Sequence, residues 1–140
     1  MALIIQPEAE KIMREHAQSD FPNECVGFLY GNDTPEGRVI QEAKPIINAK
    51  EGDQRRRFEV SPFDYMKAEQ YALKNNLTLL GVYHSHPQHP AIPSEHDLLQ
   101  ALPFFSYIIL SVMDGKTDHV RSWILDEKGA FTEENIQTTL

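Results

Sequence analysis

The residues best suited to chemistry are histidines that cluster in one short segment. Four of the six histidines lie between positions 84 and 96, and a single residue separates His84 from His86. The apolar residues before this pair predict a β-strand, on which side chains at i and i+2 share a face. Two neutral imidazoles on one face can bind the same divalent cation. The pair alone is weak evidence for a metal site, and ordinary surface or core histidines are the alternative.

A carboxylate suited to complete this site follows a proline-rich segment. Residues 87–93 contain three prolines and are expected to be irregular. Ser94 is expected to cap a helix whose first turn contains Asp97. Two imidazoles and one carboxylate suit zinc and leave a fourth position for water, which distinguishes catalytic from structural zinc sites. The alternative is that Ser94 is only a helix cap and that Asp97 only stabilises the helix dipole.

Hydrolysis at such a metal benefits from a general base and a proton shuttle. Glu24 is the candidate, because it stands at the entrance of the apolar run 25–30, where its carboxylate can point into a cleft. A half-buried position there is expected to raise its pKa. Ser94, at a helix N-terminus, can donate a hydrogen bond to an oxyanion. Spacing alone does not distinguish Glu24 from an ordinary loop carboxylate.

The remaining histidines and the lone cysteine have simpler interpretations. We interpret His89 and His96 as loop residues, and His16 and His119 as structural. Cys25, the only cysteine, lies in an apolar run and is expected to be a buried, inert thiol. A single cysteine excludes an internal disulfide framework.

Helices and strands that must position these residues alternate along the chain. Spacing and capping residues predict helices over 6–19, over 61–75 and over about eight residues from Ser94. Apolar runs and turn residues predict strands at 25–30, 39–48, 58–60, 77–86, 105–113, 119–125 and around 130–131. The inward side chains of the second helix are expected to be Phe63, Met66, Ala68, Tyr71 and Ala72. This order predicts an α/β sandwich with a mixed sheet flanked by helices.

Composition narrows the class of protein further. The chain has 140 residues, 41% of them hydrophobic, which suits one globular domain spanning 1–140. Its net charge of −8 disfavours binding to nucleic acid or to anionic lipid. No apolar run approaches the roughly 18 residues of a membrane helix, and no basic segment precedes the short apolar stretch near the start. We expect a cytoplasmic protein.

The spacing of the candidate residues resembles a known family. His84, His86, Ser94 and Asp97 match the JAMM signature (His-x-His-x7-Ser-x2-Asp) of MPN-domain metalloproteases. The segment from Pro22 to Gly27 resembles the catalytic-glutamate stretch of that family, in which Glu is followed by x-x-Gly. The resemblance extends from the first helix to the region of Trp123, and no active-site position departs from the pattern. It implies an α/β sandwich similar to that of cytidine deaminases.

The resemblance also implies an activity. Members of the family are zinc hydrolases that cut amide or isopeptide bonds at the C-terminal tails of ubiquitin-like proteins. By matching position, His84, His86 and Asp97 would bind Zn²⁺, Glu24 would be the general base and proton shuttle, and Ser94 would stabilise the oxyanion. The compact size resembles prokaryotic members, some of which release cysteine or another adduct from a ubiquitin-like sulfur-carrier protein.

The sequence also offers one loop as a candidate for substrate binding and allows two other functions. The loop 49–57 is the candidate element for binding the Gly-Gly tail of such a carrier, which can pair along a strand edge. Its arginines, Arg55, Arg56 and Arg57, can engage acidic groups or form a solvated loop. The alternative functions are a non-catalytic MPN module that binds a ubiquitin-like partner and a hydrolase of small amides. A zinc deaminase is disfavoured because its Cys-x-x-Cys pair is missing.

Overall fold

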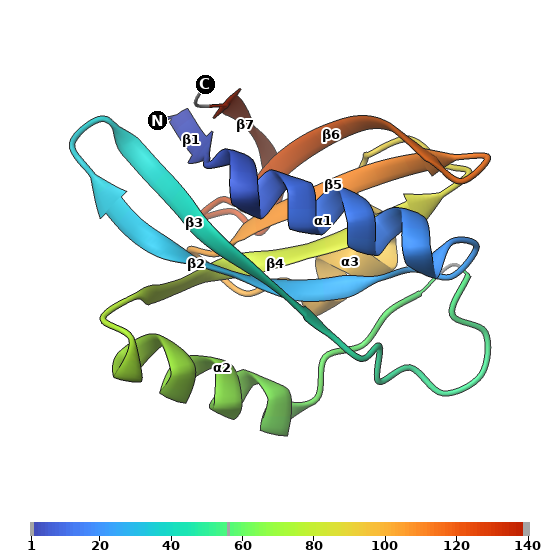
Figure 1. Ribbon diagram of the computed structural model, residues 1–140, viewed down its shortest axis with the longest axis horizontal. Helices are drawn as coiled ribbons and strands as arrows, with labels where there is room; N and C mark the ends of the chain where they lie inside the picture. The colour runs from blue at the N-terminus through green and yellow to red at the C-terminus, as the bar shows by residue number, and fades with distance from the viewer. Residues whose placement is uncertain (1, 56, 139–140) are drawn as a thin grey trace.

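The computed structural model describes residues 2–55 and 57–138. It contains three helices, α1 (Pro7–Asp20), α2 (Pro62–Lys74) and α3 (Glu95–Gln100), within the described residues (Figure 1). The strands are β1 (Ala2–Ile5), β2 (Val26–Thr34), β3 (Gly37–Ile46), β4 (Thr78–Pro87), β5 (Ser106–Met113), β6 (Lys116–Leu125) and β7 (Phe131–Thr138). The predicted mixed α/β architecture is confirmed.

The strands form one mixed sheet that closes on itself in the order β1-β3-β2-β4-β5-β6-β7. Closure occurs because the short β1 pairs in parallel with both β3 and β7. The chain ends therefore lie near each other in Figure 1, while α1 crosses the strands and α2 lies below them. β2 and β4 are antiparallel neighbours near the middle, and they carry the residues that flank the candidate site.

These central strands are buried on both faces, because helices cover each side. Leu29 and Tyr83 belong to the core that α1 packs against, together with Ala9 and Met13. Val26, Phe28 and Val82 face the opposite core, which contains Ala68 and Ala72 of α2. Period-two alternation continues along β4 past Val82, so that His84 and His86 project on the α2 side.

Several expected elements differ from those observed. Residues 58–60 form no strand. Phe58 O accepts from Gln100 Nε2 and Glu59 N donates to Asn48 Oδ1, while Glu59 O accepts a single backbone bond from Ala49 N. β1 was not expected, because four residues before a helix give too short a pattern. β6 begins at Lys116 rather than at 119, and α3 has six residues rather than eight.

The buried face of α2 also differs from the expectation. Ala68 and Ala72 are buried as predicted, but Phe63 is 57% exposed and Met66 is 48% exposed. The stripe that contacts the sheet instead includes Tyr65, whose ring packs against Phe28. Tyr65, Ala68 and Ala72 follow the i, i+3, i+7 spacing of a single helix face, from which positions 63 and 66 are displaced.

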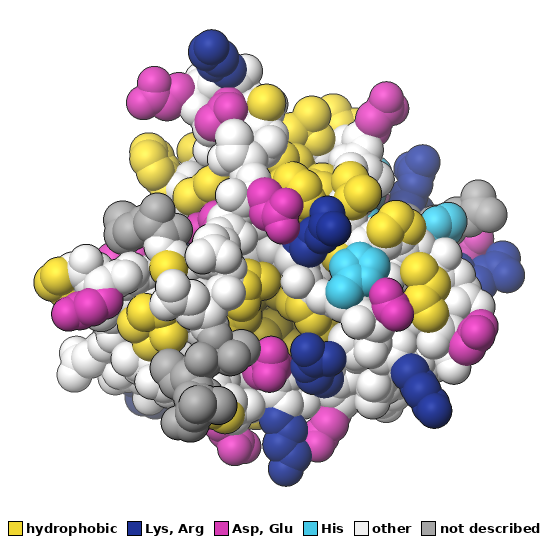
Figure 2. All heavy atoms as spheres, turned by 90° about the horizontal axis from the view of Figure 1, so that it is seen from above, with side chains coloured by type: hydrophobic (Ala, Val, Ile, Leu, Met, Phe, Trp, Pro, Cys, Tyr) yellow, Lys and Arg dark blue, Asp and Glu magenta, His cyan; other side chains and the backbone are white. Residues whose placement is uncertain are grey.

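The surface carries charges of both signs. On the face seen in Figure 2, acidic, basic and histidine side chains are interspersed, with hydrophobic side chains gathered between them. No helix among the described residues combines the length and the apolar composition needed to cross a membrane.

Candidate metal centre and active site

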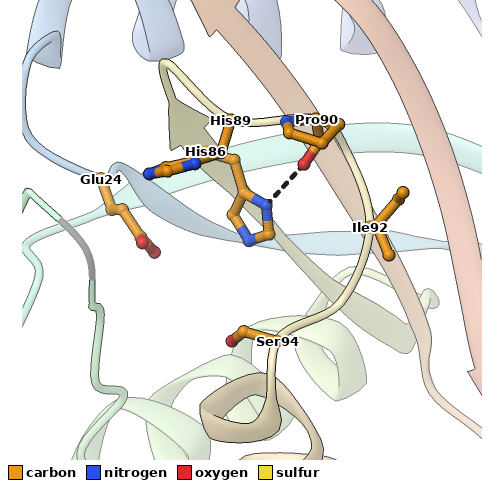
Figure 3. Close-up of a pocket in the computed structure, with 6 residues that line it drawn as sticks. All are labelled: Glu24, His86, His89, Pro90, Ile92 and Ser94. Atoms are coloured by element: carbon orange, nitrogen blue, oxygen red, sulfur yellow. Dashed lines mark hydrogen bonds between the residues drawn. The ribbon is translucent and has the colours of Figure 1, made fainter.

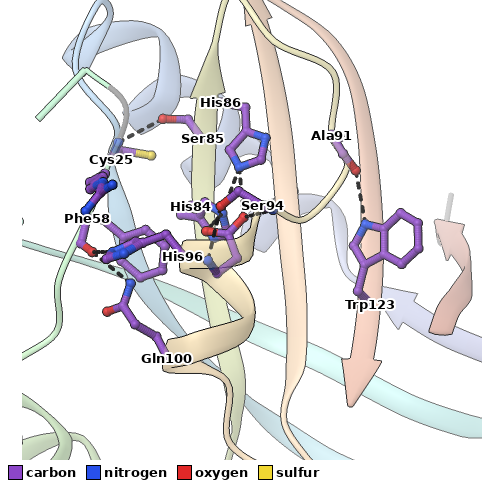
Figure 4. A network of polar contacts seen from close by, with 12 residues as sticks. Cys25, Phe58, His84, Ser85, His86, Ala91, Ser94, His96, Gln100 and Trp123 are labelled. Carbon is purple, nitrogen blue, oxygen red and sulfur yellow. Dashed lines mark hydrogen bonds and ion pairs between the residues drawn. The ribbon is translucent and has the colours of Figure 1, made fainter. Parts of the chain in front are cut away.

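Two histidine side chains meet at the carboxyl end of β4. His84 and His86 are 1% and 7% exposed, and their Nε2 atoms lie 3.2 Å apart (Figure 4). The ring of His84 packs against Phe58, with 4.4 Å between ring centroids. Burial lowers the pKa of His84, which favours the neutral imidazole that a metal ion requires.

Asp97 reaches the same point from the first turn of α3. Its carboxylate oxygens lie 3.3 Å from His84 Nε2 and 3.1 Å from His86 Nε2. Ser94 orients the aspartate through a reciprocal capping box: the Ser94 hydroxyl accepts from Asp97 N, and Asp97 Oδ2 accepts from Ser94 N. Burial alone would raise the pKa of Asp97, but the two imidazoles hold it well below its usual range.

These three residues fit a zinc ion. One ligand atom from each of His84, His86 and Asp97 lies within 4.8 Å of the others, and all three residues are buried. His86 Nδ1 is 2.9 Å from the carbonyl oxygen of Pro90. A carbonyl oxygen only accepts, so this contact favours the neutral tautomer with its proton on Nδ1 and a lone pair on Nε2 for a metal ion. Two neutral nitrogens and one carboxylate oxygen form the donor set of an open zinc site.

Glu24 lies two residues before β2 and is only 4% exposed, deeper than the half-buried position expected. Burial raises the pKa of Glu24 from its ordinary 4.5 to about 9, and the charge of Asp97 contributes further in the same direction. Among the described residues, Glu24 Oε1 has no hydrogen-bond partner. A buried carboxyl with one unpaired oxygen and a raised pKa is suited to hold and return a proton.

This raised pKa predicts a pH-dependent stability of the metal-free protein. Between pH 4.5 and 9 the folded state retains the Glu24 proton that the unfolded state releases, so the folded state loses stability as pH rises. We expect metal-free Glu24→Gln to gain stability relative to wild type by about 1–3 kcal/mol between pH 5.5 and 7.5. Urea unfolding at both pH values measures it, and a difference that does not change with pH would contradict the assignment.

Three of the candidate residues border one open cavity of about 320 Å³ (Figure 3). Figure 3 shows the carboxylate of Glu24, the ring of His86 and the hydroxyl of Ser94 converging on this space. The lining residues are Glu24, His86, His89, Pro90, Ile92 and Ser94. Of the five residues selected from the sequence, Glu24, His86 and Ser94 line the cavity. His84 and Asp97 are not part of its lining, but both contact His86.

The irregular segment between His86 and Ser94 is held by two contacts with β6 that the sequence did not predict. Ala91 is fully buried; its N–H donates to His119 Nε2, and its carbonyl accepts from Trp123 Nε1. Both partners come from β6, so nothing local in the sequence predicts the contact. His119 is therefore structural, as expected, and it supports the segment that delivers Asp97.

The other histidines and the cysteine occupy different environments. His89 lines the cavity, which its interpretation as a plain loop residue did not anticipate, and His96 lies in α3 with Nε2 3.2 Å from Phe58 O. His16 contacts the hydroxyl of Tyr83 and the carboxylate of Asp20. Cys25 is fully buried, and burial raises the pKa of its thiol to about 12, as expected of an inert cysteine.

A steric requirement explains why a glycine, Gly27, stands three residues after Glu24. Gly27 pairs with Tyr83 across the sheet, and a Cβ atom added at Gly27 would overlap the fully buried ring of Tyr83. The glycine therefore leaves the space that this ring occupies.

Comparison with known proteins agrees with this geometry. Residues 6–126 match the family model of prokaryotic homologs of the JAB domain. The chain therefore belongs to this prokaryotic JAB family, which confirms the resemblance to JAMM/MPN-domain proteins.

Two curated proteins are similar along most of the chain. One, from Thermus thermophilus, is described as "Probable TtuB-protein conjugate cleaving protease"; it is 31% identical over 114 residues, covering 81% of this chain and 70% of that protein. The other is a desampylase from Pyrococcus furiosus, 33% identical over 115 residues, covering 81% of this chain and 74% of that protein.

Solved structures share the fold. Protein DSY2949 from Desulfitobacterium hafniense superposes with a TM-score of 0.84 at 28% identity, covering 98% of this chain and 92% of that one. A structure described as "JAMM: A Metalloprotease-like Zinc Site in the Proteasome and Signalosome" has a TM-score of 0.56 at 20% identity, covering 98% of this chain and 99% of that one. The latter likeness extends to the fold alone.

Proposed function

We propose that this protein is a zinc-dependent peptidase that hydrolyses an amide bond at the C-terminal tail of a ubiquitin-like sulfur-carrier protein. The observation that carries the proposal is that His84, His86 and Asp97 converge on one point, and that His86 borders the cavity that Glu24 also lines. The named protease activity of the relative from Thermus thermophilus supports the reaction class. We further propose that residues 1–140 form a single domain and that the protein is cytoplasmic.

His84, His86 and Asp97 would hold the zinc ion, which supplies a Lewis acid that polarises a carbonyl and makes water more acidic. The positive charge of a bound zinc ion would favour the carboxylate form of Glu24. This carboxylate takes a proton from the attacking water as the water oxygen bonds to the amide carbon. When the C–N bond breaks, the same carboxyl returns the proton to the departing nitrogen. The products are a carboxylic acid on the tail and a free amine, and Glu24 is regenerated as the carboxylate.

Ser94 has a second role in this proposal. Its oxygen accepts the Asp97 amide proton, so its own O–H remains available as a donor on the cavity wall (Figure 3). The hydroxyl stabilises the oxyanion that develops on the carbonyl oxygen. The capping role and the oxyanion role use different atoms of the hydroxyl and are compatible.

The tail is proposed to reach the site along β3 and the loop 49–57. β1 pairs with β3 only from Arg38 to Ile40, so among the described strands the rest of β3 is paired on one side, by β2. This strand leads directly into the loop, whose Gln54 carbonyl accepts from the Glu24 amide. Arg55 is exposed and pairs with Asp53, and Arg56 lies outside the described residues. A thin Gly-Gly tail suits pairing along such an edge.

A cleavage assay tests the proposed function. The zinc-loaded protein is incubated with a ubiquitin-fold carrier whose Gly-Gly end bears cysteine in amide linkage, and product masses are read. We expect free cysteine and a carrier ending in Gly-Gly. A parallel conjugate linked to a lysine side chain measures isopeptidase activity. A protein that holds one zinc per chain and binds the carrier but cuts neither conjugate would instead be a non-catalytic binding module. Cleavage of small amides alone would indicate a hydrolase of small amides.

A further inference from the structure

The main chain of Glu24 and Cys25 is held by hydrogen bonds on both sides. β2 begins only at Val26, so these two residues precede the regular strand. Toward β4, Cys25 N donates to Ser85 Oγ at 2.8 Å, and Ser85 N donates to Cys25 O at 3.2 Å. Toward the loop, Glu24 N donates to Gln54 O at 2.7 Å, and Glu24 O accepts from Asn48 Nδ2 at 3.2 Å. All four main-chain groups therefore have partners.

One side chain, that of Asn48, connects Glu24 with both ends of the loop. Besides Glu24 O, its Nδ2 donates to Arg57 O at 3.1 Å. Its Oδ1 accepts from Lys50 N at 2.9 Å and from Glu59 N at 3.1 Å. An amide side chain has two donor hydrogens and two principal acceptor positions, so these four bonds use its whole capacity. Asn48 closes the loop at its base and attaches the closed loop to the glutamate.

The carboxylate contrasts with this fixed main chain. Glu24 Oε1 has no hydrogen-bond partner among the described residues, so no side-chain contact at that atom orients the carboxylate. The position of this oxygen depends on where the backbone places the side chain. Errors of about 1 Å in the placement of a reacting group can lower rates by about 100-fold.

We propose that Asn48 is a positioning residue for Glu24: it fixes the glutamate backbone by joining the Glu24 carbonyl to the two ends of the loop 49–57. The inference rests on the proposed function, since positioning matters only if Glu24 moves protons. Through the Asn48 side chain, the order of the loop 49–57 and the placement of Glu24 depend on each other.

Asn48→Asp is the sharpest variant, because it keeps the shape and both acceptor bonds while removing the two donor bonds. Asn75→Asp is the matched control: Asn75 Nδ2 also donates to a main-chain carbonyl, that of Tyr71, at the end of α2 and outside the proposed site. We expect Asn48→Asp to lower kcat about 10- to 100-fold with KM within about threefold of wild type and one zinc per chain. Asn48→Ala, which adds no charge, is expected to act in the same direction, and Asn75→Asp is expected to leave kcat unchanged.

Two further measurements separate positioning from general loop damage. In a Glu24→Gln background, Asn48→Asp is expected to change the residual kcat less than twofold, because the base it positions is gone. A rise in KM alone, or an equal loss of kcat in both backgrounds, would overturn the proposal and indicate a role in tail binding.

Amide exchange in the metal-free protein provides a readout independent of activity. We expect the Glu24 amide to exchange at least about tenfold faster in Asn48→Asp than in Asn75→Asp, as local opening becomes easier. Unchanged exchange would contradict the hydrogen-bond role itself. Faster exchange in a protein that cleaves no conjugate would leave that role intact and reject the proposed function, so the two failures are distinguishable.

Discussion

Asp97→Ala is expected to yield a folded protein that no longer retains zinc and has no measurable hydrolase activity. The substitution removes the carboxylate that lies within 3.3 Å of both imidazole Nε2 atoms. Two histidines alone leave the ion with too few protein ligands for a stable site. Metal analysis after dialysis, together with the conjugate assay, measures the effect. His84→Ala is expected to lose zinc and activity in the same way.

Asp64 is the matched control for this prediction. It holds the same position in α2 that Asp97 holds in α3, three residues after a serine cap whose hydroxyl accepts from its amide. Asp64→Ala is expected to cost no more than about 1 kcal/mol of stability through the helix start and to leave the zinc content unchanged. Full zinc occupancy in Asp97→Ala would remove the aspartate from the ligand set.

Glu24→Gln is expected to keep the fold and one zinc per chain while lowering kcat by about 10²- to 10⁴-fold, the usual contribution of a positioned general base. The amide has nearly the shape of the carboxyl group but cannot carry the proton from water to the leaving nitrogen. Steady-state kinetics on the carrier conjugate, with zinc measured in the same samples, checks this result.

Glu59→Gln provides the control, because Glu59 is an exposed acid beside the loop 49–57 and lies outside the cavity lining. It is expected to change kcat less than about twofold, as is usual for surface substitutions. Near-normal turnover in Glu24→Gln would assign the proton transfer to another group, and His89 on the cavity wall would then be the first to examine.

Part of the candidate site was predictable because it depends on local geometry. His84 and His86 share a face through the two-residue period of a strand. Ser94 and Asp97 form a capping box through the spacing of one helical turn, so the aspartate is oriented by neighbours three residues away. The prolines between the two segments stop β4 and allow the chain to return. Each of these relations is set within a few residues.

Other features depended on contacts that no local pattern contains. The short strand β1 exists because β3 and β7 are available on either side of it. Residues 58–60 favour a strand by composition, yet their main chain bonds to the Asn48 and Gln100 side chains and to Ala49 N rather than to a continuous neighbouring strand. Phe63 and Met66 were expected inward, but the sheet meets a different stripe of α2, where Tyr65 packs on Phe28.

The sequence by itself therefore determined the helices and most strands, the shared face of the two histidines and the cap that turns Asp97. Only the tertiary structure decided the environment of the Glu24 carboxyl group. Its burial, its raised pKa and its place opposite the histidines follow from the pairing of β2 with β4, in which Val26 lies opposite His84. Strand register and the closure of a sheet join residues far apart in the chain, so they are set by the packing of the whole molecule rather than by local propensity.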